Sequence, residues 1–108
     1  MKIIVNGQEA GTKETGCALC GGKWGDYYEE VDGERLFFCC EYCAREFVNM
    51  VNEVKRRTGW DRIDELRING NYYTGRTCVA IRKGEEYKFF VKFGEEGEIE
   101  LFLFKELK

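Results

Sequence analysis

The 108-residue chain contains no histidine and no proline. Without histidine, a four-coordinate metal site would have to use cysteine thiolates, alone or with carboxylates, and no imidazole is present to act as a general base. No apolar run approaches the roughly 20 residues that a membrane-spanning helix requires. A secretory signal peptide is not expected either, since the apolar run at the N-terminus stops after KIIV. We therefore expect a cytoplasmic protein.

Long stretches of positive charge are missing as well. The chain has 17 lysine and arginine residues against 20 acidic residues, which gives a formal net charge of −3. This balance disfavours non-specific binding to nucleic acids, although it leaves room for a small local basic patch. With 44% apolar and 34% charged side chains, the composition predicts one globular domain covering residues 1–108.

Cysteine, in contrast, is abundant, and five of the six cysteines lie between residues 17 and 43. Cys17 and Cys20 form a C-x2-C pair flanked by glycines, which allow the loop to turn so that backbone N–H groups point at the sulfurs. A second pair follows about twenty residues later, and it is either Cys39 with Cys43 or Cys40 with Cys43. Two pairs at this separation are typical of a tetrahedral zinc site.

The alternative for six cysteines in a short chain is a framework of disulfides. That framework requires an oxidising compartment, whereas the expected cytoplasmic location favours reduced thiols and metal binding. We therefore predict one Zn²⁺ per chain in a structural site, because four protein ligands leave no coordination position for water or a substrate. The sequence shows no nucleophile paired with a base and no phosphate-binding loop, so the protein is not expected to be an enzyme.

Two dipeptides, Asn6-Gly7 and Asp32-Gly33, are typical of the tight turns that join hairpin strands. Each predicts a short hairpin, and the second one delivers its last strand to the later cysteines. The predicted strands are residues 2–5, 8–12, 27–31 and 36–38.

The segment from residue 41 to residue 58 has the periodicity of an amphipathic helix. Apolar side chains recur there at intervals of three and four residues, and Cys43 continues the apolar stripe. Lys55, Arg56 and Arg57 lie in the last turn, where the helix dipole favours positive charge. Gly59 is a suitable residue for the C-terminal cap.

After Gly59 the sequence becomes rich in strand-forming residues. A loop is expected at residues 69–71, and an antiparallel meander of three strands follows at 72–82, 86–93 and 98–105. Alternation predicts one face of this sheet to be core, formed by Val79, Ile81, Phe89, Val91, Phe93, Ile99, Leu101 and Leu103. Phe90, Phe102 and Phe104 fall on the opposite face, where they either cover a second layer or meet a partner.

The order of cysteine knuckle, hairpin, strand-borne cysteine and helix-borne cysteine resembles a treble-clef zinc finger. Two patterns, Cys17-x2-Cys20-Gly21 and Phe38-Cys39-x3-Cys43-x3-Phe47, are similar to the signature of the TRASH/YHS group of such fingers. The segments GCALCGGKWGDYY and GNYYTGRTC also resemble a small family of archaeal zinc-binding proteins. We therefore expect an α+β fold in which a finger within residues 1–59 packs against an antiparallel sheet within residues 60–108.

The resemblance also bears on the identity of the third ligand. In the TRASH/YHS pattern the third ligand ends the strand and is followed by three residues, which corresponds to Cys39. Neighbouring strand residues point to opposite faces, so Cys39 and Cys40 are not equivalent ligands. We favour Cys17, Cys20, Cys39 and Cys43 as the metal ligands, with Cys40 as the alternative to Cys39.

Three functions are compatible with these features. The first is a zinc-stabilised module that binds a protein partner through the aromatic face of the sheet. The second, implied by the TRASH resemblance, is a sensor or chaperone of soft heavy metals that uses Cys40, with or without Cys78. The third is an RNA- or ribosome-associated module in which Tyr72, Tyr73 and Arg76 stack on bases. No membrane association and no small-molecule substrate are expected.

Overall fold

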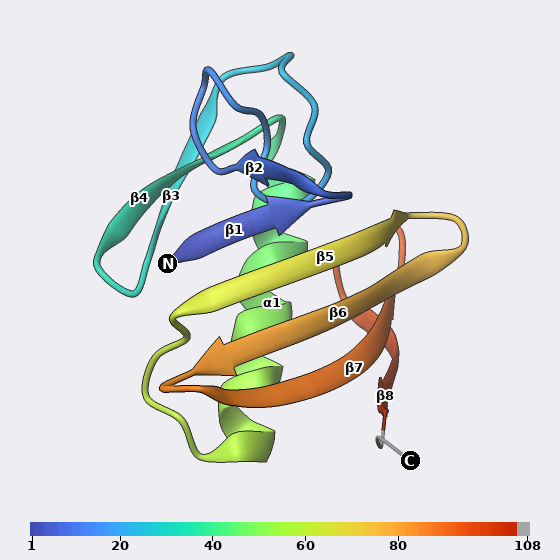
Figure 1. Cartoon of the computed structure of the whole chain (residues 1–108). Helices are drawn as coiled ribbons and strands as arrows, with labels where there is room; N and C mark the ends of the chain where they lie inside the picture. Colours follow the sequence, from blue (N-terminus) through green and yellow to red (C-terminus); the bar gives the residue numbers. More distant parts are fainter. Residues whose placement is uncertain (106–108) are drawn as a thin grey trace.

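The computed structural model describes residues 1–105. Figure 1 shows two sheets and one long helix, so the fold class is α+β as predicted. Among these residues, no helix has both the length and the apolar character that crossing a membrane demands. The elements in chain order are β1 (Lys2–Val5), β2 (Gln8–Ala10), β3 (Tyr27–Val31), β4 (Glu34–Phe38), α1 (Glu41–Thr58), β5 (Glu65–Asn71), β6 (Gly75–Arg82), β7 (Glu85–Phe93) and β8 (Ile99–Phe104).

The larger sheet has six strands in the order β2-β1-β5-β6-β7-β8, and it is mixed rather than antiparallel. β1 pairs in parallel with β5, with Ile3 opposite Leu66 and Val5 opposite Ile68. All four of these side chains are buried, so the N-terminal hairpin extends the core of the C-terminal sheet. The predicted meander of three C-terminal strands is antiparallel as expected. The parallel pairing that adds the N-terminal hairpin to the same sheet was not predicted, because it joins strands about sixty residues apart and no local sequence signal reports it.

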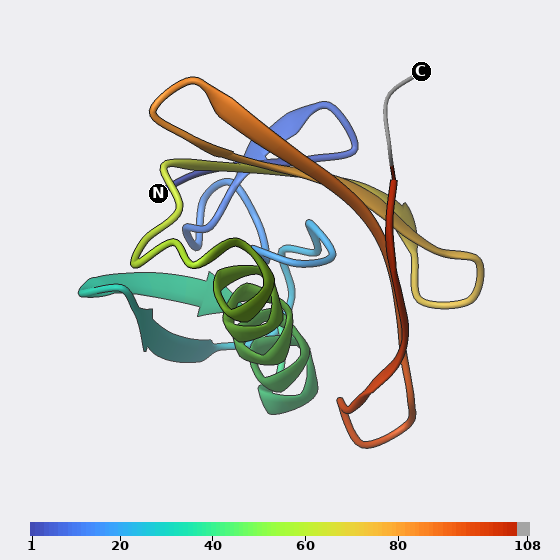
Figure 2. The ribbon, with the colours of Figure 1, turned by 90° about the horizontal axis from the view of Figure 1, so that it is seen from below.

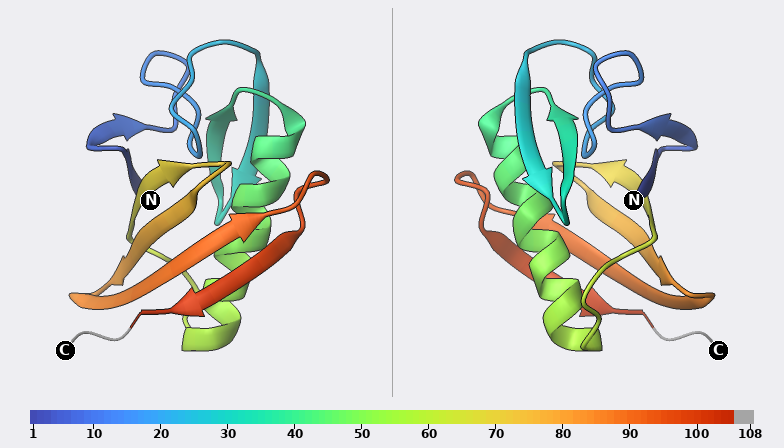
Figure 3. Two further views of the ribbon diagram at one scale, coloured as in Figure 1. Left: turned by 90° about the vertical axis from the view of Figure 1, so that its right-hand side faces the viewer. Right: turned by 90° about the vertical axis from the view of Figure 1, so that its left-hand side faces the viewer.

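Figure 2 shows how the layers are arranged around α1. The six-stranded sheet curves around the helix, and the separate hairpin β3–β4 covers a side of the helix that the sheet leaves open. Figure 3 shows the same hairpin beside the N-terminal half of α1. Phe38 of this hairpin packs edge-to-face against Phe47 of the helix, with ring centroids 5.3 Å apart.

The helix α1 has the predicted bounds, Glu41–Thr58, and the predicted termini. Its buried apolar side chains follow the helical period. Gly59 ends it in the left-handed conformation, with φ of 78°, and its N–H donates to the carbonyl of Lys55. The buried apolar residues of α1 are Ala44, Phe47, Met50, Val51 and Val54.

The loop expected at residues 69–71 is part of β5 instead. Asn69, Gly70 and Asn71 pair with the first residues of β6, so the turn comes later, at residues 72–74. The Asn71 side chain accepts hydrogen bonds from the backbone N–H groups of Tyr73 and Thr74 at 2.9 Å. Asparagine and glycine indicated a turn correctly, but cross-strand pairing shifted it by three residues.

The faces predicted for β6 and for the last strand were wrong. In β6 the core side chains are Cys78 and Ala80, whereas Val79 and Ile81 are half-buried on the other face. β7 and β8 pair with a register shift between Lys92 and Phe93, which places an additional residue in β8. Such a bulge moves every later side chain to the other face. Leu101 and Leu103 therefore lie on the outer face of the sheet, and they are 44% and 50% exposed.

The aromatic side chains of β8 face the helix side of the sheet as a result. Phe102 stacks on Phe89 with ring centroids 4.9 Å apart, and Phe104 stacks on Tyr87 at 5.1 Å. The guanidinium of Arg57, from the last turn of α1, lies 4.4 Å from the centroid of Phe102. The last strand thus packs against β7 through its aromatic rings and against the helix through Arg57.

Candidate metal centre

The first two cysteines lie in a tight turn between β2 and β3. The N–H groups of Leu19 and Cys20 donate to the Cys17 sulfur at 3.4 and 3.5 Å. The N–H of Gly22 donates to the Cys20 sulfur at 3.4 Å. Backbone donors aimed at sulfur favour the thiolate form, which is the form that binds metal. The prediction that the glycine-rich loop directs N–H groups at the sulfurs is confirmed.

Gly16 and Gly21 make this turn possible. Both have positive φ, 118° and 79°, and a Cβ added at Gly16 would collide with the carbonyl oxygen of Gly21. The turn is also tied to the second hairpin, since the Ala18 N–H donates to the Phe37 carbonyl at 2.9 Å. Local glycine geometry and one long-range hydrogen bond together fix the position of the first pair.

The second pair lies at the junction of β4 and α1. Cys39 follows the last residue of β4, Cys40 is the extended N-cap residue of the helix, and Cys43 lies in the first helical turn. The sulfurs of Cys39 and Cys43 are 3.4 Å apart. The N-terminus of a helix carries partial positive charge, which favours thiolates at this place.

Four sulfurs come together at this junction, those of Cys17, Cys20, Cys39 and Cys43, and all of them lie within 4.8 Å of one another. The sulfurs of Cys20 and Cys39, one from each pair, are 3.6 Å apart. Zinc–sulfur bonds of about 2.3 Å in a tetrahedron place neighbouring sulfurs about 3.8 Å apart. The quartet, as we call these four residues, therefore fits a tetrahedral ion if its sulfur–sulfur distances change by no more than about 1 Å.

The thiols of the quartet change one another's pKa through the hydrogen bonds between them. Hydrogen bonds from Cys20 and Cys43 lower the pKa of Cys17 to about 2. The same hydrogen bonds raise the pKa of Cys20 and of Cys43, whereas burial is the main reason that the pKa of Cys39 is raised. Because metal binds the thiolate form, a divalent cation must displace the protons that these thiols hold in order to bind.

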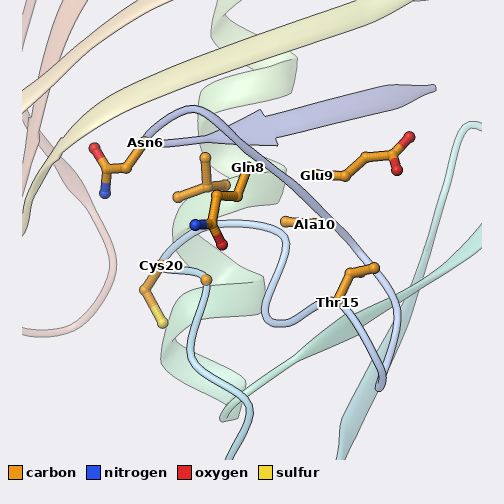
Figure 4. Close-up of a pocket in the computed structure, with 8 residues that line it drawn as sticks. Asn6, Gln8, Glu9, Ala10, Thr15 and Cys20 are labelled. Carbon is orange, nitrogen blue, oxygen red and sulfur yellow. The ribbon is translucent and has the colours of Figure 1, made fainter.

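The quartet is enclosed on one side and accessible on the other. Cys17 and Cys39 are buried, whereas Cys20 and Cys43 are half-buried. A polar hollow of about 230 Å³ lies between the β1–β2 hairpin and the knuckle, and Cys20 is among its lining residues. In Figure 4 the Cys20 sulfur points away from Gln8 and Glu9, which line the same hollow. The Cys20 sulfur is therefore not directed into this hollow.

The two remaining cysteines lie outside the quartet. The Cys40 sulfur is 4.0 Å from the Cys39 sulfur, so it is next to the centre without belonging to it. Cys78 is fully buried in β6, and burial raises the pKa of its thiol to about 12. All six cysteines lie within the described residues and are free thiols, so the alternative of a disulfide framework is not observed.

A buried ion pair lies close to the quartet, and sequence reasoning missed it. Glu46 of α1 and Arg76 of β6 are 6% and 4% exposed, and their charged groups are 3.8 Å apart. Two guanidinium nitrogens of Arg76 have no hydrogen-bond partner among the described residues. Burial raises the pKa of Glu46 to about 7, against the lowering effect of Arg76. No local pattern reports this pair, because Glu46 belongs to a helix and Arg76 to a distant strand.

The structure also shows the surroundings of Arg76 and of the basic cluster at the end of α1, two features that the sequence had singled out. Arg76 is enclosed, so it is not available to stack on bases, although Tyr73 nearby is 82% exposed. The cluster at the end of α1 is used within the fold: Lys55 forms an ion pair with Asp32 of the β3–β4 turn, and Arg57 pairs with Glu53 at 2.6 Å. Lys55 therefore ties the helix to the β3–β4 hairpin, whereas the Arg57–Glu53 pair lies within the helix.

One family of known proteins matches most of the chain, including the quartet. The model of the family named Ta0938 matches residues 14–106, which include both cysteine pairs, α1 and the strands β3 to β8. No curated protein and no solved structure matches the chain. The match does not test the resemblance to the TRASH/YHS group, which stays a prediction. Because the matching segment is far more than half of the sequence, the chain belongs to the Ta0938 family.

Proposed function

We propose that this protein is a zinc-stabilised binding module in which the quartet holds one Zn²⁺. The observation that carries the proposal is the convergence of four sulfurs within 4.8 Å of one another. Thiolate sulfur is a soft ligand that suits zinc and excludes magnesium and calcium, and four protein ligands are typical of a structural zinc site. The metal supplies no catalytic position in this arrangement, so we propose a binding role rather than an enzymatic one.

The structural role follows from what the quartet connects. Cys17 and Cys20 belong to the knuckle, whereas Cys39 and Cys43 belong to the junction of β4 with α1. An ion shared by these segments would link parts of the chain that are about twenty residues apart in sequence. Structural zinc sites contribute about 10–16 kcal/mol of apparent binding free energy, which is a large share of the stability of a small domain.

Native mass spectrometry of the purified protein tests the metal. We expect one zinc per chain, and we expect Cys39→Ser to lose it. Cys40→Ser is the matched control, because it alters the neighbouring thiol that lies outside the quartet. A protein that binds zinc equally well after Cys39→Ser, or loses it only after Cys40→Ser, would contradict the assignment.

The partner surface that we propose lies next to the metal centre rather than on the sheet. Of the predicted aromatic face of the sheet, Phe102 and Phe104 stack on Phe89 and Tyr87 on the helix side. Trp24 and Tyr42 beside the finger, in contrast, are 62% and 49% exposed. A hollow of about 240 Å³ between β3 and the start of α1 is lined by Tyr27, Glu29, Glu41, Ala44, Arg45, Val48 and Asn49.

The chemistry of this hollow favours a basic partner segment. Arg45 donates hydrogen bonds to the Glu41 carboxylate at 3.3 Å and to the Glu96 carbonyl at 2.9 Å. Since Glu41 is paired with Arg45, Glu29 is the acidic residue of the hollow that can bind an incoming cation. An aromatic wall formed by Tyr27 also attracts cations. We therefore propose a protein segment that carries lysine or arginine among apolar residues.

A pair of short peptides tests this preference. A leucine-flanked lysine peptide is titrated into isotope-labelled protein and followed by NMR, with the glutamate analogue as the control ligand. We expect only the basic peptide to shift the resonances of the hollow, and we expect Glu29→Lys to weaken binding about tenfold or more. Glu9→Lys, on β2, is the matched control variant. Equal responses to both peptides, or no response, would refute the preference.

A second candidate function is the binding of a soft metal such as Cd²⁺ or Cu(I). It is favoured by one observation, the position of the Cys40 sulfur 4.0 Å from that of Cys39, which offers a fifth thiol beside the quartet. In this case zinc exchanges readily for Cd²⁺ in the natural protein, and Cys40→Ser slows the exchange. Exchange that is unaffected by Cys40→Ser would leave only the structural role.

A further inference from the structure

The two edge strands of the six-stranded sheet differ in length and polarity. β2, at one edge, has three residues, Gln8, Glu9 and Ala10, and β8, at the other edge, has six, with the sequence IELFLF. Short or charged edge strands resist pairing with other chains, whereas a long apolar edge invites it. β8 has neither a proline nor a lysine within its bounds. The sheet is therefore protected at one edge and open at the other.

The free edge of β8 presents its backbone groups at every second residue. The N–H of Lys105 donates to the carbonyl of Lys88 in β7 at 2.8 Å. Hydrogen bonds in an antiparallel pair alternate along the strand, so Leu103, which is opposite Phe90, also faces β7. The N–H and C=O groups of Phe102 and Phe104 must then point away from β7. Within residues 1–105, no strand pairs with this side of β8.

The side chains next to this free edge are apolar on both faces of the sheet. Leu101 and Leu103 lie on the outer face at 44% and 50% exposure, and Phe104, on the other face, is 53% exposed. Exposed apolar side chains that surround unpaired backbone groups are the features of a strand that adds to another strand.

We propose that two copies of this chain pair antiparallel through β8, with their sheets joined into one continuous sheet. A two-fold axis perpendicular to the sheet keeps each side chain on its own face, so a residue lies opposite itself or opposite a residue at an even separation. The register that we propose places Phe102 opposite the partner's Phe102, where their free N–H and C=O groups bond reciprocally. Leu101 then lies opposite the partner's Leu103, which buries two leucine pairs on the outer face.

The charges at the ends of β8 favour this antiparallel arrangement. Glu98 and Glu100 lie at its start and Lys105 directly follows its end. In an antiparallel dimer the basic end of each strand lies beside the acidic end of the other, whereas a parallel arrangement would bring like charges together. The strand is thus complementary to itself in hydrogen bonding, in apolar side chains and in charge. The inference requires the folded domain and does not depend on which metal the quartet binds.

Analytical ultracentrifugation of the metal-loaded protein over a range of concentrations tests the dimer. We expect a reversible monomer–dimer equilibrium, and Leu103→Lys should raise the dissociation constant about tenfold or more, since it removes both leucine pairs. Thr77→Lys is the matched control, because it places the same side chain on the outer face two strands from the edge. Circular dichroism and zinc content establish that each variant is folded.

Hydrogen exchange provides a second measurement that does not depend on a variant. In the proposed dimer, the amides of Phe102 and Phe104 exchange more slowly as the protein concentration rises, whereas exposed amides in β2 do not change. A protein that remains monomeric at every concentration would overturn the proposal. A dimer that survives Leu103→Lys, is lost equally in Thr77→Lys, or leaves the Phe102 amide unprotected would overturn it as well.

Discussion

The segment from Gly16 to Cys43 and the strands after Glu65 achieve burial in different ways. In the first segment, tight turns place sulfurs side by side, and the buried groups are thiols whose pKa values depend on one another. In the second, strands bury phenylalanine, valine and isoleucine against a helix, and the ion pair of Glu46 with Arg76 is enclosed with them. The first arrangement would be completed by the ion that we propose, whereas the second is satisfied mainly by apolar packing.

This difference indicates that the two parts of the 108-residue chain are stabilised in different ways. The first segment buries Leu19, Phe37 and Phe38, but the turns that carry its sulfurs have few apolar side chains, and we propose that a bound metal makes up this deficit. The sheet does not share this deficit, because β1, β5, β6 and β7 each contribute buried side chains to one core. The following predictions test the division, from the largest expected effect to the smallest.

Removal of the metal should affect the first segment much more than the second. A strong chelator removes about 10–16 kcal/mol of apparent binding free energy from the folded state. We expect amides of residues 16–43 to lose protection from hydrogen exchange, while those of β5, β6 and β7 keep most of theirs. Uniform loss of protection across both segments would show that they unfold as one unit and would end the distinction.

Loss of Arg76 should be the most damaging single change in the sheet. Arg76→Ala leaves Glu46 buried without a partner, and breaking a buried pair in this way costs about 3–5 kcal/mol. Denaturant unfolding of the zinc-loaded protein measures the loss. The double variant Arg76→Met with Glu46→Leu removes both charges, so it should be more stable than Arg76→Ala. If it is less stable, the pair contributes more than the cost of its burial.

The pH dependence of stability should report the same pair. Below about pH 4.5 the Glu46 carboxyl is protonated in the folded and unfolded states, and between pH 4.5 and its folded pKa of about 7 only the folded protein keeps the proton. Its contribution to the free energy of unfolding therefore falls as pH rises through this window, by about 3 kcal/mol in total.

Glu46→Gln removes this titration and measures its size. We expect the free energy of unfolding of the natural protein, relative to that of the variant, to decline between about pH 5 and 7.5. Both proteins are measured at saturating zinc, so that the competition between zinc and protons for the thiols is the same in both and cancels in the difference. Parallel pH profiles would show that the Glu46 carboxyl is not perturbed by its burial.

A pair of glycine substitutions separates backbone conformation from close contact, and its milder member, Gly33→Ala, should produce the smallest effect. Gly16 and Gly33 both have positive φ, so alanine costs about 1 kcal/mol at either position. At Gly16 the new Cβ also meets the Gly21 carbonyl, whereas at Gly33 nothing lies within 4 Å. Thermal unfolding should therefore show a lower midpoint for Gly16→Ala than for Gly33→Ala. Equal midpoints would mean that the knuckle relaxes without cost.

Features encoded by neighbouring residues could be predicted from the sequence, and features set by distant ones could not. The helix was predicted from Glu41 to about Thr58 and is observed at Glu41–Thr58, because its apolar period and Gly59 lie within one segment. The pairing of β1 with β5 and the bulge in β8 were not predicted, since they depend on strands that meet only in the folded chain.

The candidate metal centre shows the same division at the level of single atoms. The spacing of the cysteines indicated two pairs but left Cys39 and Cys40 as alternatives on the residues alone. The structure brings the Cys39 sulfur within 3.6 Å of Cys20 and leaves that of Cys40 outside the quartet. The side chains of adjacent residues point in different directions, and the local backbone conformation sets the angle between them. Here the chain changes from strand to helix at Cys40, and this change determines where the Cys39 and Cys40 sulfurs point.

The sequence by itself determined that this protein contains paired cysteines with metal-site spacing, a single amphipathic helix beginning at them, and hairpins at its Asn-Gly and Asp-Gly turns. These features are fixed by local spacing, backbone conformation and periodicity, which short segments carry in full. Only the tertiary structure decided which sulfurs converge, that Arg76 is buried against Glu46, and that β8 keeps an open apolar edge. Those outcomes depend on the relative positions of segments far apart in the chain, and burial and strand pairing set these positions only after the whole chain has folded.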